Sequence, residues 1–208
     1  MGFKRVLIAN RGEIALRILR TLRKCGIEVA IIHGKEDRLS LPVHLSDFAY
    51  PIYRKNPLES YLDVDAVVQA AVELEVDAVH PGYGFLAENP VFADKLQNKG
   101  ITFIGPNSKV LRLLGDKIRA RGAMESVGIP VAKGSNEPIE GSIKAKNIAD
   151  EIGYPVIIKA AAGGGGIGMQ VVESHESFED ALRICTGRAQ SAFGDGRVFV
   201  EKYIEGAQ

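Results

Sequence analysis

A run of glycines directly after a short apolar strand is the feature that most constrains this chain. Glycine occupies five of the six positions from 163 to 168, and the apolar residues 156–158 and Lys159 come shortly before it. Glycine loses more conformational freedom on folding than other residues and adds no side chain to a core. Bare backbone can turn successive N–H groups toward a phosphate, and a nearby lysine adds a matching charge. The alternative is a glycine-rich surface hairpin without a ligand.

Composition narrows the class of protein. The chain has 208 residues, 46% hydrophobic and 25% charged, with a formal net charge of +0. This composition is typical of one or two globular domains, and no overall basic field favours a nucleic acid or membrane partner. The two cysteines and four histidines show no metal-ligand or disulfide spacing. No apolar run is long enough for a signal peptide or a membrane span, so we expect a cytoplasmic protein.

The first half of the chain alternates predicted strands with predicted helices. The apolar runs predict strands at 5–9, 29–32, 50–53, 78–79 and 102–104, and amphipathic stretches predict helices after Glu13 and at 62–74 and 90–99. This order favours a Rossmann-like parallel sheet with helices on both faces, in the α/β class. The first strand–helix turn contains only Gly12, so it lacks the dinucleotide-binding glycine pattern.

The second half predicts a smaller α+β unit. We expect a long helix at about 108–127 broken near Gly115, a strand near Val131, a helix at 142–152, and strands at 156–159, 169–173 and 198–202. A further helix is predicted at 177–186, with Ser174 or Ser177 as its cap. The glycine loop then joins two strands and forms a hairpin-like flap rather than a P-loop.

Five motifs occur together in a fixed order. They are IANRGEIA (8–15), HPGYGFLAEN (80–89), GDK (115–117), GYPVIIK (153–159) and EKYI (201–204). With the glycine flap, they make the whole chain resemble the biotin carboxylase component of biotin-dependent carboxylases, a branch of the ATP-grasp superfamily. The resemblance implies an N-terminal Rossmann-like domain at 1–107, a helical linker at 108–130, an ATP-grasp lid subdomain at 131–203, and the start of the C-terminal subdomain at 204–208.

The resemblance also implies a ligase reaction. ATP and bicarbonate form carboxyphosphate, whose carbon dioxide passes to biotin carried on another domain; such phosphoryl transfer depends on positioning and charge neutralisation. The positions that match the family's ATP site are Lys117, Lys159, Gly163, Gly164, Gly165, Gly166, Gly168, Met169, Glu201, Lys202 and Ile204. Met169 could equally be a core methionine.

The 80–89 motif matches the biotin or bicarbonate pocket of the family, with Tyr83 near the ligand and Glu88 as a polar neighbour. Gly82 and Gly84 indicate backbone that must turn at the carboxyl end of a strand, where open α/β sheets bind ligands. The alternative for Tyr83 is a buried aromatic residue whose hydroxyl has a partner. We interpret His80 as structural.

Three departures from the family pattern stand out. Ile167 and Gln170 replace usual basic residues of the flap, and Phe48 replaces a usual glutamate. Loss of one charged hydrogen bond at Ile167 could weaken ATP binding by about 1.5–3 kcal/mol. The family domain also continues beyond position 208, and that part holds the ligands for Mg²⁺ (or Mn²⁺), the bicarbonate-binding arginine and the proposed base. We therefore assign no catalytic or metal-binding residue here and expect the chain alone not to turn over ATP.

Two other functions remain open. One is a non-catalytic homologue that binds nucleotide or docks onto a carboxylase; the other is a different ATP-grasp carboxylate-activating ligase. The resemblance implies a biotin carboxyl carrier domain and a carboxyltransferase as partners, a homodimer as a possibility, and a mitochondrial location for a processed eukaryotic form. The final acyl acceptor stays undetermined, because that choice belongs to another domain.

Overall fold

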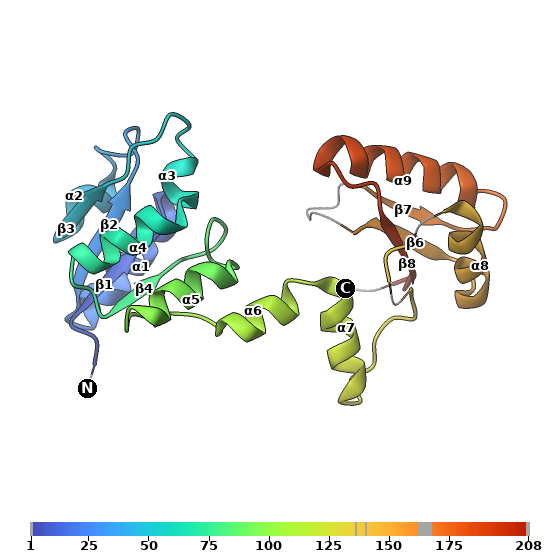
Figure 1. Cartoon of the computed structure of the whole chain (residues 1–208), viewed down its shortest axis with the longest axis horizontal. Helices are drawn as coiled ribbons and strands as arrows, with labels where there is room; N and C mark the ends of the chain where they lie inside the picture. The colour runs from blue at the N-terminus through green and yellow to red at the C-terminus, as the bar shows by residue number, and fades with distance from the viewer. Residues whose placement is uncertain (1, 136, 140, 162–167, 207–208) are drawn as a thin grey trace. The chain divides into compact units, whose positions relative to one another are not determined.

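The computed structural model describes residues 2–135, 137–139, 141–161 and 168–206, apart from the side chains of residues 117 and 118. The chain divides into two compact units, Met1–Asp116 and Lys117–Gln208 (Figure 1). Each unit has a sheet and a core of its own.

The first unit is built on five parallel strands in the order β3-β2-β1-β4-β5. The strands are β1 (Arg5–Ile8), β2 (Glu28–His33), β3 (Phe48–Pro51), β4 (Ala78–His80) and β5 (Thr102–Phe103). The helices are α1 (Gly12–Lys24), α2 (Leu41–Leu45), α3 (Glu59–Leu62), α4 (Val64–Glu73), α5 (Pro90–Asn98) and α6 (Ser108–Leu114). The predicted Rossmann-like sheet is confirmed, although β3 begins at Phe48 rather than at Tyr50.

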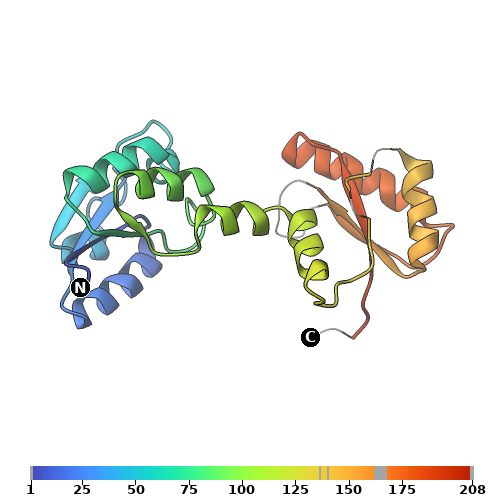
Figure 2. The same ribbon diagram turned by 60° about the horizontal axis from the view of Figure 1, so that its bottom comes forward.

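Two hydrophobic cores cover the two faces of this sheet. Leu7 of β1 packs into the core that contains Val67 of α4 and Phe92 of α5. Its neighbours Val6 and Ile8 pack into the other core, with α1. Successive side chains of a strand point to opposite faces, so a strand buried on both faces reads as the continuous apolar run seen in the sequence. Figure 2 shows α1 on one side of the sheet and α4 and α5 on the other.

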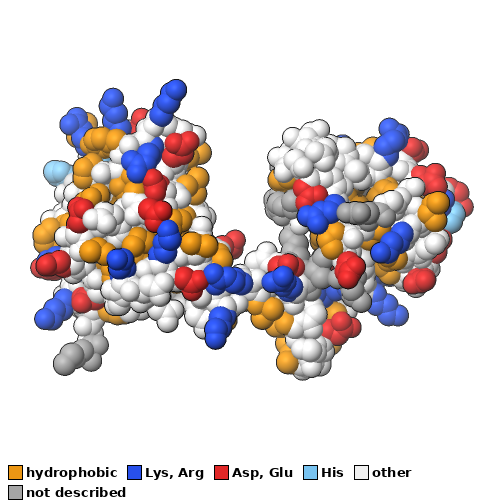
Figure 3. All heavy atoms as spheres, viewed as in Figure 1, with side chains coloured by type: hydrophobic (Ala, Val, Ile, Leu, Met, Phe, Trp, Pro, Cys, Tyr) orange, Lys and Arg blue, Asp and Glu red, His pale blue; other side chains and the backbone are white. Residues whose placement is uncertain are grey.

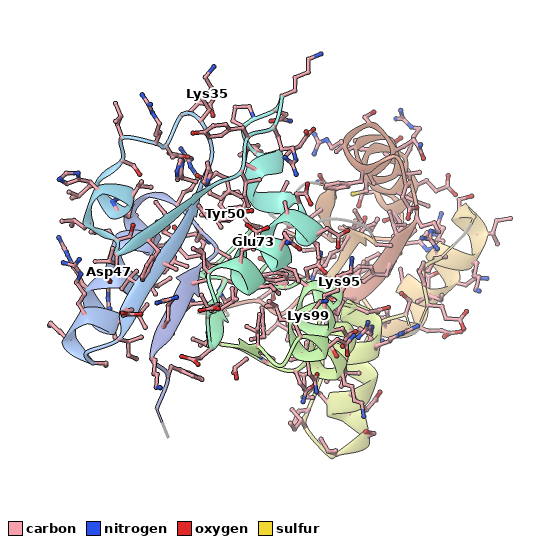
Figure 4. The ribbon with its side chains drawn as sticks, turned by 60° about the vertical axis from the view of Figure 1, so that its left-hand side comes forward. Lys35, Asp47, Tyr50, Glu73, Lys95 and Lys99 are labelled. Carbon is pink, nitrogen blue, oxygen red and sulfur yellow. The ribbon has the colours of Figure 1, made fainter. Side chains whose placement is uncertain are left out.

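The edge strand β3 is fastened to α4. The Tyr50 hydroxyl donates a hydrogen bond to Glu73 Oε2 at 2.7 Å, and the two side chains point toward each other in Figure 4. Gln69 donates to the other oxygen of Glu73, at 2.7 Å. Pro51 at the end of β3 limits further pairing, as prolines on edge strands do.

The second unit is a small antiparallel sheet with helices on one face. Its strands are ordered β7-β6-β8. They are β6 (Val156–Ala160), β7 (Met169–Val172) and β8 (Val198–Lys202), and the helices are α7 (Lys117–Ser126), α8 (Ser142–Ile152) and α9 (Phe178–Phe193). Val156, Ile158 and Val200 share a core with residues of α8 and α9 (Figure 1). The predicted α+β unit and the pairing of β6 with β7 are confirmed.

Three details of the second unit differ from the sequence predictions. No strand forms at Val131; Gly134 instead makes a single antiparallel bridge with Glu201 at the outer edge of β8. Ser177 does not cap α9, because its hydroxyl donates to the carbonyl of Ser174 at 3.0 Å. The helix also continues past 186 to Phe193 and ends at Gly194 in the left-handed conformation.

Candidate functional site

One face of the second sheet is left uncovered by α8 and α9. Because Val156, Ile158 and Ala160 are buried on the helix side, the alternate residues Ile157 and Lys159 point to the opposite face. Directly opposed residues of antiparallel strands share a face, and Lys159 pairs with Met169 on one side and with Phe199 on the other. In the next row Ile157 pairs with Val171 and Glu201. We call these six residues the open face.

The open face combines apolar side chains with one close ion pair. Lys159 Nζ lies 2.5 Å from Glu201 Oε2, and the two side chains are 29% and 17% exposed. Met169 is 41% exposed, whereas Phe199 is buried. Exposed apolar surface such as that of Met169 can pack against the ring of a base, and the ammonium group of Lys159 beside it can neutralise a phosphate. The expectation that Met169 is a core residue does not fit its exposure.

Arg121 of α7 joins this ion pair from the side. Its Nη2 donates hydrogen bonds of 2.9 Å to the carbonyl oxygens of Gly134 and Ser135, and its Nη1 lies 3.8 Å from Glu201 Oε1. The side chain is only 13% exposed. A Cβ on Gly134 would collide with Arg121 Nη1 and would lie 2.8 Å from the carbonyl oxygen of Val200. Glycine at 134 therefore makes room for the guanidinium.

Lys202 and Ile204 occupy different environments from Glu201. Lys202 Nζ donates to the carbonyl oxygens of Gly153 and Tyr154, both at 2.9 Å, so this ammonium ties β8 to the turn before β6. Ile204 follows the end of β8 and is exposed. The side chain of Lys202 thus points to the face of β8 opposite to Glu201.

The glycine flap lies largely outside the described residues. This applies to Gly163, Gly164, Gly165 and Gly166, and also to Ile167. Gly168 is described: its φ is +75°, and its carbonyl oxygen accepts a hydrogen bond of 3.0 Å from the N–H of Ala160. Lys117 is the first residue of α7, and its side chain is outside the description.

The first unit carries a second cluster, at the point where its strand order reverses between β1 and β4. Asn10 follows β1 and is 2% exposed. Its amide Nδ2 donates to the carbonyl oxygens of Pro81 at 2.8 Å and Tyr83 at 2.9 Å. The Tyr83 hydroxyl donates to Glu13 in the first turn of α1, at 3.1 Å. Ligands of open α/β sheets bind in this kind of crevice.

Tyr83 is exposed rather than buried. Its side chain is 63% exposed, although its hydroxyl has Glu13 as a partner, and this hydrogen bond raises the pKa of the phenol. Glu88 is also exposed, in the turn before α5, and no hydrogen bond joins it to Tyr83 in the described part of the chain. The structure thus places both residues on the loop between β4 and α5 without linking them.

His80 behaves as a structural residue. Its Nδ1 accepts a hydrogen bond of 3.0 Å from the N–H of Gly82, and burial lowers the pKa of the imidazole. Both features favour the neutral ring, because an Nδ1 that accepts carries no proton. His80 therefore shapes the turn that presents Tyr83.

The described residues contain no group of three or more His, Cys, Asp or Glu side chains placed to hold a metal ion. Within the same residues, no helix is both long and apolar enough to cross a membrane. Lys and Arg side chains lie among Asp and Glu side chains on the face shown in Figure 3.

The sequence analysis missed Arg121, Gly134 and Asn10 as candidate site residues. Arg121 lies in a polar stretch and is indistinguishable by sequence from a solvent-exposed surface arginine. Gly134 precedes a predicted helix and is indistinguishable from an ordinary loop glycine. Asn10 belongs to the IANRGEIA motif (8–15). A polar amide directly after a buried strand was the sequence signal that could have marked it as a site residue.

A parallel α/β unit followed by a small antiparallel sheet, with a lysine–glutamate pair on its open face, is consistent with an ATP-grasp type of protein. The biotin carboxylase N-terminal domain family matches residues 2–111. The ATP-binding domain family of the carbamoyl-phosphate synthase L chain matches residues 116–208. The first match covers more than half of the chain, so the chain belongs to the biotin carboxylase family.

Individual relatives agree with this family. The biotin carboxylase of Haemophilus influenzae is 46% identical over 203 residues, which are 97% of this chain and 45% of that protein. The biotin carboxylase of Halalkalibacterium halodurans is 47% identical over 98% of this chain and 45% of its own length. The chain thus spans less than half the length of these relatives.

Solved structures show the same fold. The biotin carboxylase domain dimer of the Hydrogenobacter thermophilus 2-oxoglutarate carboxylase, in complex with MgADP, ADP and bicarbonate, superposes with a TM-score of 0.90 at 44% identity, over 99% of this chain and 45% of that one. The biotin carboxylase β,γ-ATP complex from Campylobacter jejuni gives a TM-score of 0.90 at 44% identity, over 98% and 46%.

Proposed function

We propose that this chain supplies the N-terminal domain and the nucleotide lid of a biotin carboxylase, which uses ATP and bicarbonate to carboxylate protein-linked biotin. The observation that carries the proposal is the open face, where the Lys159–Glu201 pair lies beside exposed Met169. Lys159 is also close in sequence to the glycine run. The match to the N-terminal domain of biotin carboxylase favours this ligase over other ATP-grasp enzymes.

In this proposal ATP lies against the open face. Met169 and Ile157 contact the adenine ring, and the main chain from Glu201 to Ile204 binds its polar edge. The ammonium group of Lys159 neutralises phosphate charge, as phosphoryl transfer requires. Phosphate contacts also come from Lys117 and from the backbone of Gly163, Gly164, Gly165, Gly166 and Gly168.

In the first unit, Tyr83 and Glu88 are proposed to face biotin or bicarbonate. Asn10 holds the Tyr83 loop against β1, so that the phenol is presented at the strand-order reversal. The described residues do not fit a magnesium site, because no three carboxylate, imidazole or thiol side chains lie together among them. The proposed partners are the biotin carboxyl carrier domain, a carboxyltransferase and a second copy of the chain, in the cytoplasm or the mitochondrion.

Calorimetric titration of the 208-residue chain with ADP tests the nucleotide site. Lys159→Met removes the phosphate-facing charge, so we expect a loss of affinity of at least about tenfold, since a charged hydrogen bond contributes about 1.5–3 kcal/mol. Lys144→Met removes a lysine from the exposed surface of α8 and is the matched control. Equal affinities for the two variants would refute this location of the site.

A further inference from the structure

Glu201 of the open face has two cationic neighbours, one on the same face and one in α7. Lys159 lies at 2.5 Å from one carboxylate oxygen and Arg121 at 3.8 Å from the other. We propose that Arg121 is a positioning residue that keeps Glu201 neutralised while Lys159 transfers from Glu201 to a nucleotide phosphate. This inference rests on the proposed function, because it assigns Lys159 a phosphate ligand.

Moving the ammonium group of Lys159 from Glu201 to a phosphate leaves the carboxylate of Glu201 without its nearest counter-ion. Without nucleotide, Lys159 and Glu201 neutralise each other within a contact of 2.5 Å. A phosphate that approaches Lys159 competes with Glu201 and is repelled by its charge. Because Glu201 is only 17% exposed, water can replace the lost ammonium poorly, and an unpaired part-buried carboxylate is strongly destabilising.

Arg121 is built to remain in place during this exchange. Two hydrogen bonds of 2.9 Å, from Nη2 to the carbonyl oxygens of Gly134 and Ser135, fix its guanidinium plane. The fixed fork directs Nη1 toward Glu201, and a lysine could not hold both carbonyls and the carboxylate in this geometry. The bare backbone of Gly134 provides the space.

A simpler role for Arg121 would be to tie α7 to residues 134 and 135. Such a role would affect every ligand of the open face in the same way. The proposed role affects only ligands with a phosphate that reaches Lys159, and it depends on the charge of Glu201. Dependence on a ligand phosphate and on the charge of Glu201 therefore distinguishes the proposed role of Arg121 from a purely structural one.

The test compares ADP with adenosine by calorimetric titration of the 208-residue chain. Arg121→Gln is expected to weaken ADP binding roughly tenfold while leaving adenosine binding within about twofold. In a chain that already carries Glu201→Gln, the same substitution should no longer change ADP affinity, because no carboxylate then needs a counter-ion. Arg121→Lys should recover part of the loss. Equal weakening of ADP and adenosine, or a full effect in the Glu201→Gln background, would overturn the proposal.

The effect of Arg121 on the Lys159–Glu201 ion pair can also be measured without a ligand. The coupling between Lys159 and Glu201 can be obtained from urea unfolding of Lys159→Met, Glu201→Gln and the double variant. We expect this coupling to increase when Arg121→Gln is also present, because Glu201 then depends on Lys159 alone. An unchanged coupling would contradict the inference. If the chain bound neither ADP nor adenosine, the proposed function would fail for this chain, and the unfolding cycle would still decide the role of Arg121.

Discussion

The side-chain amide of Asn10 occupies the space that a side chain on Gly82 would need. A Cβ on Gly82 would lie 2.6 Å from Asn10 Nδ2, closer than carbon and nitrogen atoms approach without a bond. The same Nδ2 holds the carbonyl oxygens of Pro81 and Tyr83. The side-chain amide of Asn10 therefore holds the turn after β4 against the turn after β1, and glycine at position 82 leaves the space that this amide needs.

Gly82→Ala should test this lock. The φ of Gly82 is +68°, which costs an alanine about 1 kcal/mol, and the contact with Asn10 adds to this cost. We expect a loss of about 2–3 kcal/mol in the free energy of unfolding by urea. Gly84→Ala is the matched control, since its φ is +66° and nothing lies within 4 Å of its Cβ position. Equal losses for the two variants would show that the contact with Asn10 carries no energy.

Asn10→Ala removes both donors from the carbonyl oxygens of Pro81 and Tyr83. We expect it to lower the free energy of unfolding by about 2 kcal/mol, because buried acceptors lose their partners. Hydrogen exchange should also become faster in the loop that carries Tyr83. Asn98→Ala, at the exposed end of α5, should change neither quantity. Unchanged exchange in the Tyr83 loop would argue that Asn10 does not order it.

Asp37 links the start of α1 to α3 and makes stability depend on pH. Arg11 donates to both oxygens of this carboxylate, at 2.6 and 2.7 Å, and the Tyr61 hydroxyl donates at 2.7 Å. The hydrogen bonds from Arg11, followed by that from Tyr61, lower the pKa of Asp37 below its ordinary value of 3.8. A lowered pKa in the folded state means that the stabilisation is complete above about pH 4 and is lost as the pH falls through the folded pKa.

Asp37→Asn should therefore destabilise the protein at pH 7 by about 1 kcal/mol, a value kept small because Arg11 is partly exposed. The difference from the unchanged chain should shrink as the pH falls below 4. Asp65→Asn, whose carboxylate is 80% exposed beside Lys95, should change the free energy of unfolding at pH 7 by only about 0.5 kcal/mol. Urea unfolding at a series of pH values measures both, and a pH-independent loss for Asp37→Asn would refute this account.

Gly134→Ala should disturb both the open face and the backbone of β8. The new Cβ would meet Arg121 Nη1 and would lie 2.9 Å from Glu201 Cγ and 2.8 Å from the carbonyl oxygen of Val200, so two side chains and one strand must shift. We expect weaker ADP binding and a loss of about 1–3 kcal/mol in the free energy of unfolding. Gly122→Ala, in α7 with nothing within 4 Å, should be neutral or stabilising because alanine favours helices. An ADP affinity unchanged by Gly134→Ala would contradict the proposed arrangement.

Sequence patterns predicted the first sheet well because burial on both faces leaves continuous apolar runs, as in β1 and β2. The break near Gly115 was also predicted correctly, since this glycine ends α6. The prediction of a strand near Val131 was wrong. This segment pairs with β8 only through the isolated bridge between Gly134 and Glu201, and a contact with a strand so distant in sequence cannot be predicted from local residues.

The candidate site was less predictable than the fold. Lys159 and Glu201 are 42 residues apart and meet only because β6 and β8 pair in one register. Local patterns cannot give this register, nor the distant partners of Lys202, which are the carbonyl oxygens of Gly153 and Tyr154. Arg121 joins them from a helix whose sequence shows no apolar face of its own.

The central claim is that nucleotide binds at the open face, and the methyl group of Met169 reports on it directly. Met169 is one of three methionines, is exposed and pairs across the sheet with Lys159. The measurement is a titration of the ¹³C-methyl-methionine-labelled chain with ADP, followed by NMR. We predict a saturable shift of the Met169 signal that Lys159→Gln weakens and Lys144→Gln does not. Binding of ADP with an unmoved Met169 signal would contradict the account.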